Sequence, residues 1–334
     1  MALPTEIRED TSELLPFDRY DHVIVSFSGG KDSLACVLYA LELGIPKEKI
    51  ELWHQAVDGK PGVDPRFFDW PCTESYCRDV ARVLGLPIKF QWRDGGFERE
   101  INKQDVPTAK IGFELPDGSI GQAGGTGEPN TRLMFPAAVA DLRTRWCSAI
   151  LKIDVATSAI NNDPRFKTGK ILEITGERRQ ESNNRARYAE VEKHKSTTQS
   201  RRVDQWRAII DWPEERVWEI IQRWGIRAHP AYHLGWGRVS CMFCIFGNPD
   251  QWASANAVNP RMFWRILNYE RQFGRTIQQG GDIERLASKG KSYVRDDPEM
   301  IRIAMSDEVP HGYAQAGAAW TMPFGAFKRS GGPL

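Results

Sequence analysis

Short β-branched runs alternate with stretches of helical periodicity along the N-terminal part of the chain. Apolar runs at 22–27 (HVIVSF), 49–57 (KIELWHQAV) and 87–92 (PIKFQW) predict three strands. Helical periodicity at 32–43 and 73–84 predicts the two helices that connect them. Strands that alternate with helices at this spacing indicate βαβ units, and hence a parallel, twisted sheet covered on both faces.

The pattern resumes after a break and predicts two more strands, at 170–175 (KILEIT) and 206–211 (WRAIID). One or two helices are expected within 133–160, and another at 214–224, where Pro213 suits the first turn. We therefore expect an α/β fold, a Rossmann-like parallel five-stranded sheet with helices on both faces.

Composition divides the rest of the chain into candidate units. Residues 94–131 are too rich in glycine for a packed element, and a loop of this length is typical of a lid or binding insertion. Residues beyond 246 are polar and helical in pattern, especially 260–272. We expect an N-terminal extension (1–20), a main domain (21–246, with 94–131 inserted) and a mostly helical C-terminal extension (247–334).

Charge and hydropathy narrow the class of protein. The 334 residues include 45 basic and 44 acidic ones, so polyanion binding would need a local patch. No apolar run of about 18 residues is present, which argues against a membrane span. The acidic N-terminus lacks the apolar segment of a signal peptide. A cytoplasmic protein with reduced thiols and no membrane partner is expected.

A glycine turn follows the first predicted strand, in the segment FSGGKDS at 27–33. A strand that turns through glycines into a helix presents backbone N–H groups at a helix N-terminus, a combination that binds phosphate. Lys31 adds a cation, and Ser28 and Ser33 add hydroxyl donors. The spacing matches neither Walker A nor GxGxxG. The alternative is a plain turn whose lysine faces solvent.

The same residues resemble the SGGxDS signature of the PP-loop ATP pyrophosphatase superfamily. This resemblance implies cleavage of ATP between the α- and β-phosphates, release of pyrophosphate and adenylation of a substrate. Gly29, Gly30, Asp32 and Ser33 would then contact the departing pyrophosphate, with Ser28 and Lys31 at its edge.

Three of the six cysteines are candidate metal ligands. Cys241 and Cys244 form a CxxC, and two thiolates at this spacing can share one metal centre. Cys147 is the best third ligand, and the alternative is that it is a buried small hydrophobe. Zinc with His233 as a fourth ligand and a redox dithiol are rival interpretations. Cys36 is expected in the core, and Cys72 and Cys77 are expected to be structural.

Ordered blocks after the loop sharpen the resemblance: RWCSAILK at 145–152, ITGERRQESNNRAR at 174–187 and AYHLGWGRVSCMFCIF at 231–246. Together with SGGKDS they resemble the phosphoadenosine phosphosulfate (PAPS) reductase-like branch of the superfamily, over roughly two-thirds of the chain. That branch has an adenine nucleotide alpha-hydrolase-like fold. It implies Lys31 and Asp32 as catalytic residues. The implied nucleotide or phosphate contacts also include Ser26, Ser28, Gly29, Gly30, Ser33, Lys152, Gly176, Arg178 and Arg179.

Three departures separate this chain from the sulfonucleotide reductases of that branch. No cysteine follows Cys244, Trp146 precedes Cys147 where cluster-bearing members have paired cysteines, and the loop lysine is kept. The resemblance is closer in character to Dnd-type sulfurtransferases of DNA phosphorothioation. It implies an adenylating sulfurtransferase that uses ATP with Mg²⁺ and a [4Fe-4S] cluster on Cys147, Cys241 and Cys244. A PAPS or APS reductase and a non-catalytic nucleotide- and DNA-binding subunit remain alternatives.

The segment 178–207 holds nine basic residues against four acidic ones. Arg178 and Arg179 follow a predicted strand at the carboxyl edge of the sheet, where α/β folds bind ligands, and arginine suits phosphate. The remainder could contact nucleic acid or form a solvated loop of mixed charge. A sulfur-donor protein such as a cysteine desulfurase is a possible partner, and the chain could oligomerise.

Overall fold

The computed structural model describes residues 14–139 and 141–328. The expected N-terminal extension, 1–20, therefore lies mostly outside the described residues. A short 3-10 helix, Phe17–Arg19, leads to the buried Tyr20 at the start of the fold. The Tyr20 hydroxyl donates to Asp204 at 2.6 Å and so ties the entering chain to the sheet.

One eight-stranded sheet forms the centre of the molecule, in the order β5-β4-β3-β2-β1-β6-β8-β7. Its five inner strands, from β3 to β8, run parallel, as the sequence pattern predicts. The strands are β1 (His22–Ser26), β2 (Ile50–Ala56), β3 (Ile88–Arg93), β4 (Ile111–Glu114), β5 (Ile120–Ala123), β6 (Gly169–Ile174), β7 (Val191–Lys193) and β8 (Arg201–Trp206).

The glycine-rich segment 94–131 is not a bare loop, contrary to expectation. It forms α3 (Gly96–Ile101) and the antiparallel strands β4 and β5, which extend the sheet beyond β3. Glycine is needed at one contact here, because a Cβ on Gly112 would lie 2.5 Å from the Trp92 ring. Gly112, and Gly121 against Phe113, therefore pack under aromatic rings within a folded segment.

The fifth parallel strand lies earlier than predicted. It is Arg201–Trp206, whereas most of 206–211 is a turn. The sequence RRVDQW lacks the apolar pattern expected of a buried strand, because two of its buried residues, Arg201 and Asp204, are charged. Arg201 donates to the carbonyl oxygens of Ile160 and Phe166, so tertiary contacts offset the cost of burial.

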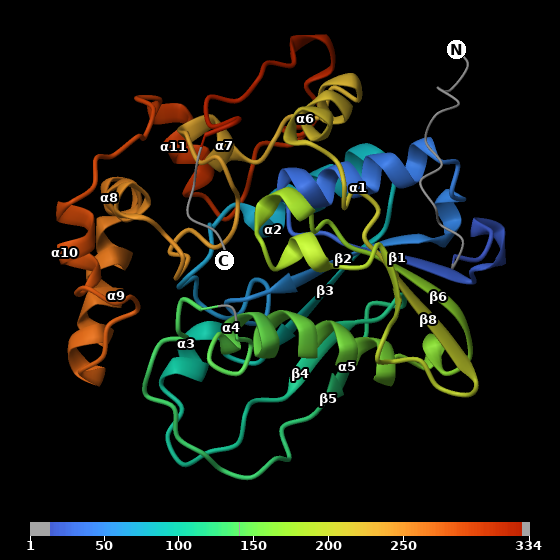
Figure 1. Cartoon of the computed structure of the whole chain (residues 1–334), viewed down its shortest axis with the longest axis horizontal. Helices are drawn as coiled ribbons and strands as arrows, with labels where there is room; N and C mark the ends of the chain where they lie inside the picture. Colours follow the sequence, from blue (N-terminus) through green and yellow to red (C-terminus); the bar gives the residue numbers. More distant parts are fainter. Residues whose placement is uncertain (1–13, 140, 329–334) are drawn as a thin grey trace.

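Helices cover both faces of the sheet (Figure 1). α1, α2 and α6 lie over one face, while α5 lies over the other together with the apolar cluster of Ile24, Trp53, Ile171 and Val203. Helix formation within 133–160 begins only at α4, and a π-helical turn, Ala149–Ile153, joins α4 to α5. The helices around the sheet are α1 (Lys31–Glu42), α2 (Thr73–Leu84), α4 (Trp146–Ser148), α5 (Asp154–Asn162), α6 (Glu214–Arg223) and α7 (Pro230–Leu234).

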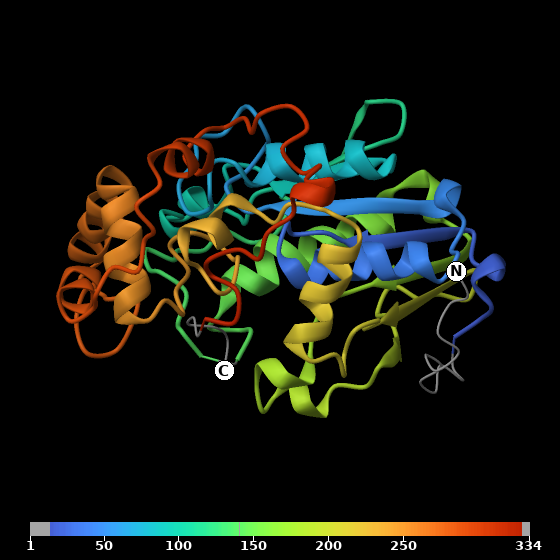
Figure 2. The same ribbon diagram turned by 90° about the horizontal axis from the view of Figure 1, so that it is seen from above.

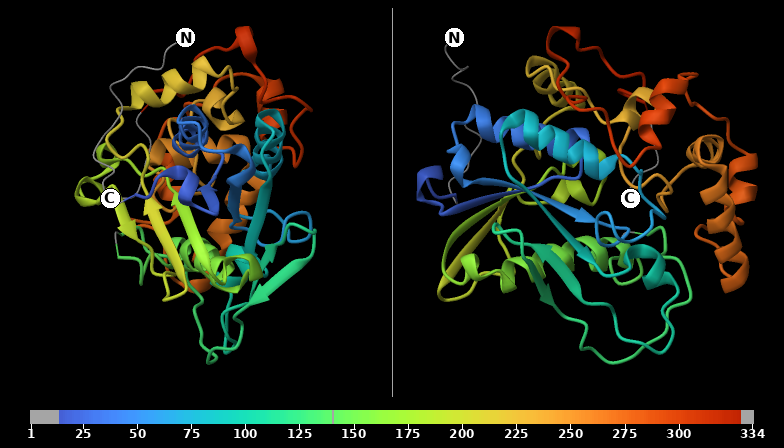
Figure 3. Two further views of the ribbon diagram at one scale, coloured as in Figure 1. Left: turned by 90° about the vertical axis from the view of Figure 1, so that its right-hand side faces the viewer. Right: turned by 180° about the vertical axis from the view of Figure 1, so that it is seen from behind.

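The C-terminal part is helical up to residue 304 and gathers at one end of the molecule (Figure 2). Figure 3 shows these C-terminal helices at one end of the sheet. In its right-hand view, the loops around β4 and β5 run along the lower side of the molecule. Its helices are α8 (Pro249–Val258), α9 (Pro260–Phe273), α10 (Ile283–Ser288) and α11 (Pro298–Ala304). None of the helices in the described ranges has the length and apolarity needed to span a bilayer.

Candidate nucleotide and cysteine site

The turn between β1 and α1 is built by glycine and serine. Gly29 has a φ of +79°, and Gly30, the N-cap of α1, is extended at φ −75° and ψ 158°. A Cβ on Gly29 would lie 3.1 Å from the Cys77 sulfur, so glycine is required for both conformation and space. The Ser33 hydroxyl donates to the Gly30 carbonyl at 2.9 Å and closes the turn. α1 therefore begins directly after the turn, at the carboxyl end of β1.

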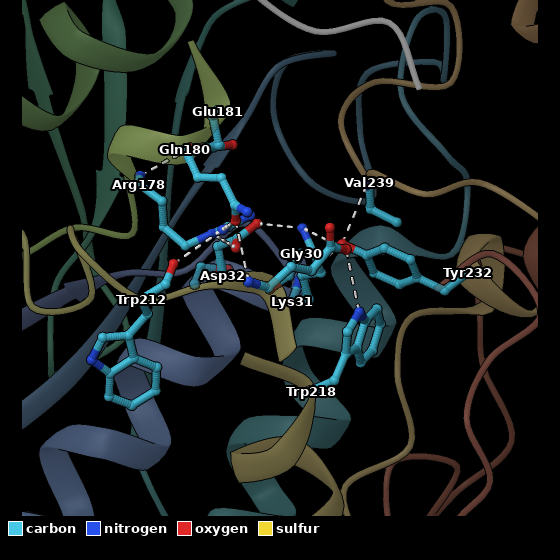
Figure 4. A network of polar contacts seen from close by, with 12 residues as sticks. Gly30, Lys31, Asp32, Arg178, Gln180, Glu181, Trp212, Trp218, Tyr232 and Val239 are labelled. Carbon is cyan, nitrogen blue, oxygen red and sulfur yellow. Dashed lines mark hydrogen bonds and ion pairs between the residues drawn. The ribbon is translucent and has the colours of Figure 1, made fainter. Parts of the chain in front are cut away.

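Lys31 and Arg178 share Asp32 as their counterion (Figure 4). The Lys31 ammonium lies 2.9 Å from one Asp32 oxygen, and the Arg178 Nε lies 2.6 Å from the other. Both cations are buried, and Lys31 also lies 3.7 Å from Glu214. Asp32 lines the cavity described below, whereas Lys31 does not.

Two cations dominate the electrostatics of Asp32. Burial by itself would raise the pKa of its carboxyl, but Lys31 and Arg178 outweigh burial and hold that pKa below its usual value. Burial also opposes the charge of Lys31, yet Asp32, Tyr232 and Glu214 raise the pKa of Lys31 above its ordinary value. Asp32, Lys31 and Arg178 are therefore charged near neutral pH.

Tyr232 on α7 joins this turn to the cysteine-bearing segment. Its hydroxyl accepts the Lys31 amide at 2.9 Å and the Val239 amide at 3.3 Å. Tyr232 is buried, and one oxygen thus positions residues from two distant parts of the chain. The sequence analysis did not predict that Tyr232 joins the two segments. The sequence indicates it only by the tyrosine in the block AYHLGW.

A cavity of about 1090 Å³ opens at the carboxyl ends of the parallel strands. This volume is at the upper end of the roughly 300–1,000 Å³ of small-molecule sites. The phosphate loop contributes Ser28, Gly30, Asp32 and Ser33 to its wall, and Ser26 and Gly176 lie next to them. Gly29, Lys31, Arg178 and Arg179 are not among the lining residues.

The three candidate cysteines line the same cavity, together with Lys152. Burial and then Cys244 raise the pKa of Cys147 to about 11, while burial and then Asp69 raise that of Cys241. Lys152 is half-buried; burial lowers its pKa, but Cys241, Asp69 and the other two cysteines raise that pKa above the ordinary value. Lys152 therefore lies among the sulfur atoms, although the resemblance implies a phosphate contact for it.

The cysteines do not form a metal centre as positioned. Within 14–139 and 141–328, no group of three or more His, Cys, Asp or Glu side chains is arranged to hold a metal ion. All six cysteines are free thiols. His233, the expected fourth zinc ligand, is not among the residues that line the cavity. Cys36, Cys72 and Cys77 are buried in the core, as expected.

The basic segment 178–207 is largely neutralised by its own neighbours. Six of its nine cations pair with carboxylates: Arg178, Arg179, Arg185, Lys195, Arg202 and Arg207. Arg179 pairs with Asp211 and donates to the Tyr188 carbonyl at 2.9 Å.

Gly176 packs closely against the backbone of Asp32. A Cβ on Gly176 would lie 3.0 Å from the carbonyl carbon of Asp32.

Glu173 is a cavity residue that sequence reasoning missed. It sits near the end of β6, is 6% exposed, and accepts from the Ser26 hydroxyl at 3.4 Å. Burial, followed by the nearby Glu177, raises the pKa of Glu173 to about 7. The signal was a charged residue within the apolar strand KILEIT.

Known proteins resemble this chain in sequence more clearly than in structure. A relative from Escherichia phage 186, an uncharacterized 37.8 kDa protein in the gpa 5′ region, is 28% identical over 269 residues, or 77% of each chain. Candida glabrata FMN adenylyltransferase, in complex with FAD and inorganic pyrophosphate, has a TM-score of 0.36 at 11% identity. That alignment covers 90% of this chain and 81% of the enzyme. The same enzyme with FMN and the ATP analog AMPCPP gives 0.35. These structural scores are too low to support an argument.

The phosphoadenosine phosphosulfate reductase domain family model matches residues 132–246. This segment carries Cys147, Lys152, Arg178, Cys241 and Cys244. Its residues share one cavity with the SGGKDS loop. Residues 132–246 are therefore similar to the phosphoadenosine phosphosulfate reductase domain, in agreement with the resemblance that the sequence motifs indicate.

Proposed function

We propose that this PP-loop enzyme is an ATP-dependent, adenylating sulfurtransferase that releases pyrophosphate. One observation carries the proposal: the phosphate-binding turn and three cysteines line the same cavity. A nucleotide held by the turn would therefore have its reacting phosphate and a sulfur nucleophile within one enclosed space.

In the first step, an oxygen of the acceptor attacks the α-phosphorus of ATP. The bond from that phosphorus to the oxygen of the β-phosphate breaks, and pyrophosphate leaves with the electron pair. Ser28, Gly30, Asp32 and Ser33 of the turn line the cavity in which this charge would develop. Mg²⁺ bound with ATP would supply further charge neutralisation. Lys31 and Arg178 hold Asp32 in place at the cavity wall.

In the second step, a sulfide nucleophile attacks the acceptor atom, carbon or phosphorus, that bears the adenylated oxygen. The bond from that atom to the oxygen breaks, and AMP leaves with the oxygen. Cys147, Cys241 or Cys244 could hold the incoming sulfur, because all three line the cavity. A cysteine desulfurase could supply it in the cytoplasm.

The [4Fe-4S] cluster stays a prediction, with Cys147, Cys241 and Cys244 as its ligands. The described side chains do not fit a metal centre as they stand, so no step of the proposed reaction passes through a cluster. Iron and acid-labile sulfide analysis of anaerobically purified protein tests it.

Nucleic acid is the acceptor class proposed from the resemblance to phosphorothioation enzymes. The mostly paired cations of 178–207 give this acceptor limited electrostatic support. Arg187 and Lys193 have no ion pair among the described residues and would be the first contacts to test.

Replacing Lys31 tests the ATP step. Lys31→Ala removes one of the two cations that hold Asp32, and we expect pyrophosphate release from MgATP to fall by at least about 100-fold. Pyrophosphate and AMP are measured together, so that cleavage between the β- and γ-phosphates is distinguished. Lys31→Arg keeps the charge, and Lys89→Ala, on β3, is the control. Wild-type release from the folded Lys31→Ala variant would contradict the proposed role.

A sulfonucleotide reductase is the second candidate, favoured by the family match over 132–246. It would form sulfite from APS or PAPS with a thiol donor and would not release pyrophosphate from ATP. Sulfite formation without ATP cleavage would replace the sulfurtransferase proposal. ATP binding without either reaction would indicate a non-catalytic subunit.

A further inference from the structure

A row of polar side chains crosses the floor of the cavity beneath α5. On this face of the sheet the amino-terminal halves of four parallel strands carry apolar residues, namely Ile24, Trp53, Ile171 and Val203. Two residues later each strand turns polar, with Ser26, Gln55, Glu173 and Gln205, and all four line the cavity. Because side chains on one face of a strand recur every second residue, the row continues the same face.

Glu173 is the only carboxylate in this row, and two side chains hold it. The Ser26 hydroxyl donates to one carboxylate oxygen at 3.4 Å, and His194 Nε2 lies 3.7 Å from the other. The Ser196 amide donates to His194 Nδ1, so in the neutral imidazole the proton resides on Nε2, toward Glu173. Burial lowers the pKa of His194 to about 4, which keeps the ring neutral at physiological pH.

Charged groups of both signs surround Glu173. Glu177, which follows β6, raises the pKa of the Glu173 carboxyl, while Arg207 after β8 and Lys195 after β7 lower it. Burial exceeds all of these effects and brings that pKa to about 7. A carboxyl that titrates near neutrality and opens on a cavity has the properties required of a proton acceptor.

We infer that Glu173 is the general base that takes the proton from the oxygen acceptor before adenylation. The acceptor class is a protic oxygen group, a hydroxyl or a lactam in its enol form. Its O–H proton passes to a Glu173 carboxylate oxygen, and the freed electron pair forms the bond to the α-phosphorus. The bond from that phosphorus to the β-phosphate oxygen breaks and pyrophosphate leaves. This inference rests on the proposed ATP cleavage and adds the acceptor side of the site.

The test uses water as the acceptor and follows pyrophosphate release from MgATP between pH 5 and 9. We expect wild-type kcat to rise along a limb with its midpoint near pH 7, because only the ionised Glu173 accepts a proton. Glu173→Gln should lower kcat by about 10²–10⁴-fold, remove the limb and leave KM for ATP unchanged. Glu177→Gln should keep the limb but shift it to lower pH, because a negative neighbour is lost.

Glu299→Gln, which removes an exposed carboxylate on α11, is the control and should reproduce the wild-type profile. Four outcomes overturn the inference. A wild-type limb in Glu173→Gln shows that another group is the base. A raised KM with unchanged kcat makes Glu173 a nucleotide ligand. If the wild type releases no pyrophosphate, the proposed function is overturned and the base role with it. If the wild type releases pyrophosphate and Glu173→Gln releases it at the same rate, the base role alone is overturned.

Discussion

Single residues at the phosphate loop serve geometry as much as charge. Lys31, expected from the motif to meet phosphate, is buried against Asp32, and the side chain that reaches the cavity from this network is Asp32. Gly29 makes room for Cys77 behind the turn. The spacing of SGGKDS therefore indicates the site, but it does not say which side chains line it.

Gly29→Ala should show that both the φ and the space at this position are required. The left-handed φ of +79° costs an alanine about 1 kcal/mol, and the contact with the Cys77 sulfur adds to that cost. Gly44→Ala is the matched control, because Gly44 has a φ of +73° with nothing within 4 Å of the added Cβ. We expect chemical denaturation to show a larger loss of stability for Gly29→Ala, with loss of pyrophosphate release in that variant alone. Equal losses of stability would contradict the steric requirement.

At the scale of elements, a buried carboxylate ties the glycine-rich insertion to the sheet. Glu100 on α3 is fully buried and binds Arg132 at 2.7 Å and the Ala109 amide at 3.2 Å. Lys103 lies 3.7 Å from it. The insertion is thus anchored at both ends, which is the opposite of a freely moving lid.

Glu100→Ala should loosen this insertion by leaving Arg132 and Lys103 without their shared anion. Removal of one partner from a buried ion pair costs about 3–5 kcal/mol. We expect faster hydrogen exchange across 102–132, measured by mass spectrometry, with the inner strands still protected. Asp117→Ala, at the exposed turn after β4, serves for comparison and should change little. If hydrogen exchange across 102–132 is equally fast in Glu100→Ala and Asp117→Ala, Glu100 does not anchor the segment.

At the scale of the whole molecule, buried titratable groups set the pH range of stability. Burial lowers the pKa of His54 to about 4 and that of His229 to about 3, below the ~6.5 of an unfolded histidine. Their contribution is fully present above pH ~6.5 and is lost as the pH falls toward those values. Asp69 and Glu173, with pKa values of about 7 caused first by burial, act in the opposite direction.

The pKa values of His194 and His233 are also lowered to about 4, and that of His22 is lowered as well. We expect the histidines to prevail, because five imidazoles with lowered pKa values oppose four carboxyls with raised ones, which are Asp58, Asp69, Glu173 and Glu270. The denaturation midpoint should fall between pH 6.5 and 4.5, and His54 alone accounts for up to about 3 kcal/mol over its full range. His311→Gln, at an exposed position, should leave this acid limb unchanged. A midpoint that is flat or rises on acidification would refute the prediction.

The sequence by itself determined the parallel core, since β-branched runs and helical periodicity are local signals. α2 begins and ends where the pattern predicts, at Thr73–Leu84. The strand Arg201–Trp206 escaped prediction because buried charges masked its pattern, and only their distant partners make it a strand. The strands β4 and β5 escaped because glycine reads locally as loop, while Gly112 packs under Trp92.

The candidate site, too, depends partly on local sequence and partly on tertiary contacts. SGGKDS locates the glycine turn between β1 and α1, because the turn is made by adjacent residues. Only the tertiary structure brings three cysteines from two segments to the same cavity and buries Glu173 beside Ser26. Burial and through-space charge depend on contacts between residues far apart in the chain, so no local pattern encodes the altered pKa of Glu173 or the ion pair between Asp32 and Arg178.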